Sequence, residues 1–482
     1  MQSIKKRRSL LAAALFPLFF SACPTGVERV SLPALGENSF YAQNFTNNKF
    51  YEVKAEMLVE GDYCVVWAEQ SAKVSLTIAK NIAYDYDHNI YPKMIEAFSS
   101  NEGYDVIVDE EIKHFGNILD FANWLAKGDA GDGRLTILLL DIKDGYTLSG
   151  NSYTAGYFWR DNFLGSHFSN EADMIYVDTY PNNLNLPESR ATIAHELQHL
   201  INYATSVYID RQQPVDTWID EGLSSAAEYL YLENHPFGRY GWFINDLEGT
   251  IARGNNFFVW GNHKDIPNAI LDDYGSVYLF FQWLRLQNGG DPGIYKQVIT
   301  SPYPDERAVT AAAAKTLPAN GPDYGKWETL LGTWLAANYI RNPSGPYGYL
   351  SDPTLSRPDV WANKVWSIQV PENTLDLAPG EAVYSAISGQ SFTPPADSGD
   401  NILYAGITQA KNKNAGGITA EPPYSGDMLL TFNGNTLFNG PPEPGFLTGG
   451  PADFKLPRLS GRQALPELYA VDPRDLPGRP RE

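Results

Sequence analysis

The hydrophobic pattern of the first 180 residues predicts strands on either side of a helix. Residues 51–80 alternate apolar and polar side chains and are rich in β-branched residues, as half-buried strands are. From Thr77 to Phe98 apolar residues recur every three or four positions, which predicts a helix, and residues 118–125 show a shorter helical pattern. The apolar runs Leu135–Leu140 and Ala172–Asp178 predict two further, buried strands.

Helical periodicity dominates residues 188–340. It predicts helices at Ser189–Ala204, Asp216–Glu233, Gly275–Gln287 and Trp327–Tyr339. After about Asn342, Pro and Gly become frequent, and short apolar runs between turns predict a C-terminal β-sandwich-like domain over residues 342–470. Residues 471–482 are predicted to be a disordered tail. The expected fold class is therefore α+β.

Composition and charge narrow the classes of protein. The chain has 482 residues, of which 43% are apolar and 19% charged, so it can bury a sizeable core. Its formal net charge is −21. A body this acidic repels phosphate backbones, which argues against general nucleic-acid binding.

The N-terminus has the pattern of an export signal. Lys5–Arg8 are basic, Ser9–Phe20 form an apolar stretch too short to span a bilayer, and two small residues precede Cys23. Residues 20–23, Phe-Ser-Ala-Cys, resemble a bacterial lipobox, which implies a signal peptide at residues 1–22 and a lipid on Cys23. The chain would then be an exported lipoprotein anchored to a membrane by this lipid, in the periplasm or at the cell surface. The alternative is an ordinary signal peptide followed by a chance cysteine.

The most informative motif is His195-Glu196-Leu197-Gln198-His199, within a predicted helix. The i, i+4 spacing puts both imidazoles on one face, where they can share a Zn²⁺ ion at about 2.0–2.1 Å. Glu196 follows the first histidine and can act as a general base toward a metal-activated water. The apolar flanks predict a buried helix, where two histidines and a glutamate would be costly without a metal.

A second motif lies on the next predicted helix. Residues 218–223 read Trp-Ile-Asp-Glu-Gly-Leu, and with the His-Glu-x-x-His motif they resemble the gluzincin metallopeptidases. The wider pattern over roughly residues 50–300 resembles the hyicolysin-type neutral metallopeptidases. The resemblance implies a zincin-type fold, in which a mixed sheet with an edge strand packs beside a helical subdomain that carries both motifs. It also implies that His195, His199 and Glu221 bind one catalytic Zn²⁺ and that Glu196 is the base.

The resemblance also suggests a residue that stabilises the oxyanion. Residues 273–284 resemble the stretch of the thermolysin-like aminopeptidases that begins with their oxyanion tyrosine, which implies Tyr274, at the head of a predicted helix. Tyr278 is the second candidate, and His235 and His263 are weaker ones. A packed aromatic without a catalytic role is the alternative for Tyr274.

Two departures from the family pattern bear on function. Ser225 stands where the thermolysin-like enzymes place an aspartate that orients a zinc histidine, so other residues must orient the histidines here. The Gly-x-Met-Glu-Asn element that captures a free amine in the aminopeptidases is absent, which favours an endopeptidase. The strand at 172–178 is a candidate for the sheet edge that binds extended peptide, with an ordinary core strand as the alternative.

The sequence therefore predicts a zinc-dependent endopeptidase that acts on polypeptides. Residues 23–75 form a tether and β-rich segment, and residues 76–341 form the catalytic domain. The alternative is a surface lipoprotein whose peptidase-like domain serves binding or adhesion with little turnover; an intact Glu196 argues against it. Residues 129–133, Asp-Ala-Gly-Asp-Gly, could hold Ca²⁺, but they lack the spacing of a calcium loop, so a solvated acidic turn is favoured.

Overall fold

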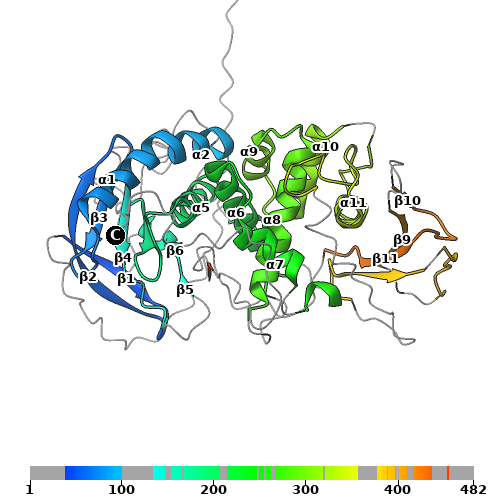
Figure 1. Ribbon diagram of the computed structural model, residues 1–482, viewed down its shortest axis with the longest axis horizontal. Coiled ribbons are helices and arrows are strands. Elements are labelled where there is room, and N and C mark those ends of the chain that lie inside the picture. Colours follow the sequence, from blue (N-terminus) through cyan, green and yellow to red (C-terminus); the bar gives the residue numbers. More distant parts are fainter. Residues whose placement is uncertain are drawn as a thin grey trace, which may run out of the picture. The chain divides into compact units, whose positions relative to one another are not determined.

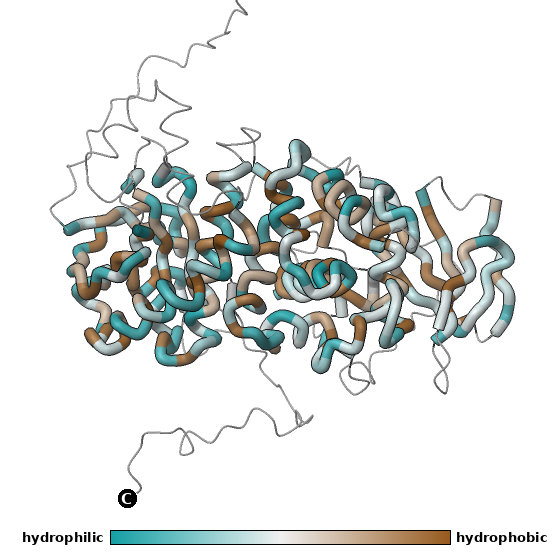
Figure 2. Tube along the Cα trace, turned by 90° about the horizontal axis from the view of Figure 1, so that it is seen from above, coloured by the Kyte–Doolittle hydropathy of each residue, from teal (hydrophilic) through white to brown (hydrophobic). Residues whose placement is uncertain are grey.

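A computed structural model describes most of the chain after residue 37. The described ranges are 38–99, 134–146, 153–206, 214–356, 377–436 and 453–454, with gaps at 164–167, 171, 247–248, 255–256, 262–265, 267, 319–320, 388, 397–398, 400 and 410–415. Cys23, His263, the short helix expected at 118–125 and the acidic turn at 129–133 lie outside them. Within these ranges no helix is long and apolar enough to cross a bilayer, and Figure 2 shows hydrophilic and hydrophobic residues interleaved along the described elements.

The main sheet is mixed and has six strands in the order β1-β2-β3-β4-β7-β6. Its strands are β1 (Ser39–Asn44), β2 (Lys49–Glu60), β3 (Cys64–Glu69), β4 (Leu135–Leu140), β6 (Gly156–Phe158) and β7 (Met174–Asp178). β3, β4 and β7 run parallel to one another, whereas the β1–β2, β2–β3 and β7–β6 pairs are antiparallel. The strands expected in the N-terminal β-rich segment thus belong to the same sheet as β4 and β7.

Both faces of the sheet are buried at β4, whose six residues are all buried and, apart from Thr136, apolar. On one face, Ile137 and Leu139 share a core with the helices, while Leu138 and Leu140 face a second core on the other side. The second core is enclosed because the sheet curls. Tyr176 Oη, on β7, donates to the carbonyl of Tyr41 on β1 at 3.0 Å.

Helices cover the face of the sheet that carries Ile137 and Leu139, and further helices pack beside them (Figure 1). The helices against the sheet are α1 (Leu76–Asp85), continued by a π-helical turn (Tyr86–Ile90) into α2 (Tyr91–Phe98), and α5 (Pro187–Tyr203). The remaining helices are α6 (Thr217–Leu232), α7 (Phe237–Asn245), α8 (Ile270–Gln287), α9 (Gly293–Ile299), α10 (Glu306–Thr316) and α11 (Trp327–Ile340), with 3₁₀ turns at Arg160–Phe163 and Ile251–Arg253. α6 packs between α5 and α8.

The C-terminal strands form a four-stranded antiparallel sheet, β10-β9-β11-β8. They are β8 (Ala382–Ala386), β9 (Ile402–Thr408), β10 (Gly417–Thr419) and β11 (Met428–Asn433). Tyr384 Oη donates to the carbonyl of Leu335 at 2.6 Å, which ties this sheet to α11. In the part of the chain that the structure describes, this region is one sheet on a helix and not the sandwich of two sheets that we expected. A further two-stranded pair joins β5 (Tyr153–Thr154) to β12 (Asp453–Phe454).

Two other expectations need correction. The strand at 172–178 is not an edge, because β7 pairs with β4 on one side and with β6 on the other. The edge on this side is β6, which the sequence analysis missed. The helix expected from Gly275 begins at Ile270, so Tyr274 lies in its second turn and not at its head.

Candidate metal centre

Two buried helices carry the predicted ligands. Every residue of α5 from Ala191 to Tyr203 is buried, as its apolar flanks predicted. On α6, Glu221 is followed by Gly222, and a Cβ there would lie 2.7 Å from Val277 Cγ2 and even closer to the ring of Phe281. The glycine therefore lets α6 approach α8 closely and fixes the depth at which Glu221 faces α5.

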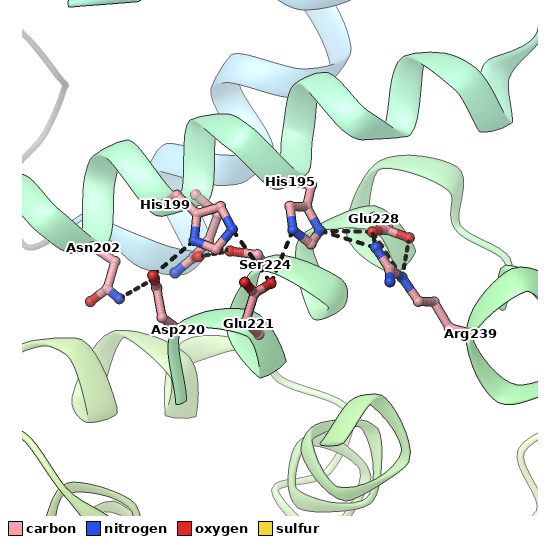
Figure 3. Close-up of polar contacts among 9 residues, drawn as sticks. His195, His199, Asn202, Asp220, Glu221, Ser224, Glu228 and Arg239 are labelled. Carbon is pink, nitrogen blue, oxygen red and sulfur yellow. Dashed lines mark hydrogen bonds and ion pairs between the residues drawn. The ribbon is translucent and has the colours of Figure 1, made fainter. Parts of the chain in front are cut away.

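The ligand atoms of His195, His199 and Glu221 converge on one point (Figure 3). One ligand atom from each residue lies within 4.8 Å of the others. Glu221 Oε2 lies 3.4 Å from His195 Nε2 and 3.6 Å from His199 Nε2. All three atoms are buried without a hydrogen-bond partner. Three buried, unbonded ligand atoms would be costly unless they shared a cation, so the residues fit a metal ion.

The other ring nitrogens are held by carboxylates. His195 Nδ1 lies 2.8 Å from Glu228 Oε1, and His199 Nδ1 lies 2.9 Å from Asp220 Oδ2. A carboxylate can only accept, so each Nδ1 carries the proton, and each Nε2 would be free to offer its lone pair to a bound metal. Ser224 Oγ also lies 3.0 Å from His199 Nδ1.

Glu228 and Asp220 orient the two histidines in place of the aspartate that Ser225 replaces. Neither Glu228 nor Asp220 was predicted, yet helical spacing could have identified Glu228. It lies seven residues after Glu221, two turns along the same face of α6. Asp220 gives no comparable signal, because adjacent residues on a helix point in different directions.

The electrostatics of the site separate the two glutamates. Burial raises the pKa of Glu196 to about 7 against the opposing effect of the histidines. Burial acts the same way on Glu221, but His199 and His195 outweigh it and lower the pKa of Glu221 to about 2. Glu221 thus stays ionised as a ligand, while Glu196 can exchange a proton near neutral pH. A cation bound beside Glu196 would bring this raised pKa back down.

Two of the candidates for the oxyanion donor are hydrogen-bonded to each other. Tyr278 Oη is already bonded to His235 Nδ1, and His235 Nε2 lies 3.0 Å from Asp352 Oδ2. Both residues therefore belong to a buried network of their own. Tyr274 is 4% exposed and packs edge-on against Trp260. Its role in the reaction stays a prediction.

Comparison with known proteins gives one clear likeness. No family model matches the chain. Over 284 residues it is 28% identical to the neutral metalloprotease ShpI of Staphylococcus hyicus. The aligned stretch is 58% of this chain and 57% of the relative, so the chain spans little more than half the relative's length. The likeness supports a metallopeptidase family. Together with the buried His-His-Glu cluster it suggests zinc-dependent proteolysis.

We expect zinc affinity to fall as the pH is lowered through the neutral range. Burial alone would lower the pKa of His195 and of His199, but the surrounding carboxylates outweigh it and raise both pKa values. Zinc binds only neutral imidazoles. Because both pKa values are raised, protons begin to compete with zinc at a pH above the ordinary histidine pKa of about 6.5. Chelator competition at a series of pH values measures this effect. An affinity that stays constant between about pH 8 and about pH 6.5 would contradict it.

Proposed function

We propose that the chain is a zinc-dependent endopeptidase of the gluzincin type. The observation that supports this most directly is the convergence of His195 Nε2, His199 Nε2 and Glu221 Oε2, three buried atoms without hydrogen bonds. Two imidazoles and one carboxylate are a ligand set found in catalytic zinc sites that keep a position open. When bound, zinc would supply the Lewis acidity that activates water and polarises a peptide carbonyl.

In this proposal Glu196 handles the proton. Its two carboxylate oxygens are buried and have no hydrogen-bond partner, so neither is committed to holding the fold. Glu196 accepts a proton from the attacking water and delivers it to the leaving amine. Tyr274 donates from its phenol to the developing oxyanion.

The position of β6 supports an extended polypeptide as the substrate. β6 ends the sheet and packs on α5, and a Cβ on Gly156 would lie 3.2 Å from Glu196 Cγ. A peptide that pairs with the outer edge of β6 would therefore run past the base.

We further propose that a lipid on Cys23 holds the enzyme on the outside of a cytoplasmic membrane or on an outer membrane.

Zinc content and cleavage of a peptide library by residues 24–482 test the proposal. We expect about one zinc ion per chain, internal cleavage, loss of cleavage on chelation and recovery when zinc returns. Chelation should also lower the melting temperature, because the metal binds only the folded chain. Cleavage that persists without metal would refute the proposal. Removal of single N-terminal residues alone would refute endopeptidase action.

Gly156→Ala tests how closely β6 must approach Glu196. The added methyl would lie 2.6 Å from Thr192 Cγ2 and 2.8 Å from the carbonyl oxygen of Tyr176, so β6 must shift. We expect a loss of about 1–3 kcal/mol in the free energy of unfolding and a fall in kcat on the order of 10–100-fold. Gly417→Ala is the control, because a Cβ there meets nothing within 4 Å. Equal behaviour of the two variants would show that β6 has no such role.

A further inference from the structure

Arg239 is a buried cation that no step of the proposed reaction uses. It lies on α7 and is 2% exposed. Its Nε donates to Glu228 Oε1 at 3.0 Å and to Glu228 Oε2 at 3.1 Å, and its Nη2 also contacts Oε1. The planar guanidinium thus fixes the orientation of the carboxylate plane, which the single point charge of a lysine cannot do.

The carboxylate held by Arg239 is the one that orients a predicted metal ligand. Glu228 Oε1 accepts from His195 Nδ1 at 2.8 Å, and Arg239 Nη2 lies 3.4 Å from the same nitrogen. Figure 3 shows the series His195, Glu228, Arg239 leading away from Glu221. Any rotation of Glu228 would turn the imidazole and move Nε2 away from the point that it shares with His199 and Glu221.

The same guanidinium also contacts Tyr274. Arg239 Cζ lies 4.7 Å from the centroid of the Tyr274 ring, a cation–π contact. The next residue, Gly275, brings the backbones of α7 and α8 together, since a Cβ there would lie 2.9 Å from the nitrogen of Phe243 and 3.0 Å from the carbonyl oxygen of Arg239. α7 and α8 therefore cannot shift independently at this level.

We propose that Arg239 is a positioning residue that holds the metal ligand His195 and the phenol of Tyr274 in one fixed relation. The inference rests on the proposed function for the role of Tyr274, but its first half concerns metal binding alone. A buried ion pair is by itself weak evidence for stability, because desolvation offsets much of the attraction. Orienting His195 and Tyr274 is a role for the buried Arg239–Glu228 ion pair that does not depend on a net gain in stability.

Three variants of residues 24–482 separate the effect of Arg239 on His195 from its effect on Tyr274: Arg239→Met, Arg239→Lys and Tyr274→Phe. We expect Arg239→Met to weaken zinc affinity about 10–100-fold by chelator competition, and Arg239→Lys to restore part of it. Tyr274→Phe should lower kcat and leave zinc affinity unchanged. When Arg239→Met and Tyr274→Phe are combined, the loss in kcat should be smaller than the product of the two single losses, because Arg239 acts partly through Tyr274. Arg239→Lys keeps the buried charge and is the variant to measure if Arg239→Met does not fold.

Arg285→Met is the matched control. Arg285 is also buried, stacks over Tyr229 with Cζ 4.3 Å from the ring centroid, and donates to Gln282; neither partner is a predicted metal ligand. The Arg285→Met variant should be less stable than the native chain but should bind zinc with the native affinity. Equal zinc affinities in the Arg239 and Arg285 variants would overturn the inference, and fully multiplicative losses in kcat would overturn its link to Tyr274. If the native chain binds zinc but cleaves nothing, the proposed function fails, whereas the zinc affinities still decide the role of Arg239 at His195.

Discussion

Glu196→Gln is expected to abolish proteolysis and leave zinc in place. The amide has the shape of the carboxylate but cannot accept the proton of the attacking water, and loss of a general base costs about 10²–10⁴-fold in kcat. Both carboxylate oxygens lack hydrogen-bond partners, so the substitution breaks no contact in the fold. Zinc content should stay at the native level, because Glu196 is not among the three converging ligands.

The same variant should stabilise the metal-free protein at alkaline pH. Burial raises the pKa of Glu196 to about 7 in the folded chain, above its value in the unfolded chain. Stability is therefore lost as the pH rises from the ordinary glutamate pKa of 4.5 to about 7, because the unfolded carboxyl ionises in this range and the buried one resists ionisation; above about 7 the loss is complete. The amide carries no such penalty. Thermal unfolding of the apoproteins should show Glu196→Gln melting above the native chain at high pH, with the difference shrinking toward acidic pH.

Glu188→Gln is the control for Glu196→Gln. Glu188 lies in the first turn of the same helix and is exposed, so its amide should leave cleavage and stability unchanged. Full activity of Glu196→Gln would show that another group is the base. If the native chain and Glu196→Gln both hold zinc and are both inert, the alternative of a surface lipoprotein used for binding is favoured.

The convergence of the two histidines could be predicted because it depends on local geometry. The i, i+4 spacing of His195 and His199 fixes their relation once the segment is helical, and the helix is confirmed. Glu221 could be placed by its motif but not by physics, because its distance from the histidines depends on how α5 packs against α6. The sequence showed the glycine beside it, and only the structure shows that Gly222 admits Phe281.

The lateral order of the sheet could not be predicted. β7 is buried on both faces, so its residues look alike whether it lies inside the sheet or at its edge. β6 has three residues, too few for a recognisable alternation, yet it is the strand that lies beside Glu196. The orienting residues Asp220 and Arg239 depend on contacts between helices, and no spacing along the chain encodes them.

Glu221→Gln is expected to cause the largest loss of metal. Structural zinc sites bind with about 10–16 kcal/mol from four ligands, so one ligand contributes about 2.5–4 kcal/mol, or about 10²–10³-fold in affinity. The amide keeps the size of the side chain but loses its charge, and cleavage at limiting zinc should fall with the affinity. Glu233→Gln, at the exposed end of the same helix, is the control and should bind zinc normally.

Comparing Glu221→Gln with Asp220→Asn distinguishes a ligand from an orienting residue. Asp220 contacts His199 through Nδ1, on the far side of the ring from the metal point, so its amide should weaken zinc by about 10–100-fold. Glu221 faces both Nε2 atoms and should matter more. Isothermal titration of zinc into the apoproteins gives the order. If Asp220→Asn loses more affinity than Glu221→Gln, then Glu221 is not the third ligand, and the gluzincin assignment fails with it.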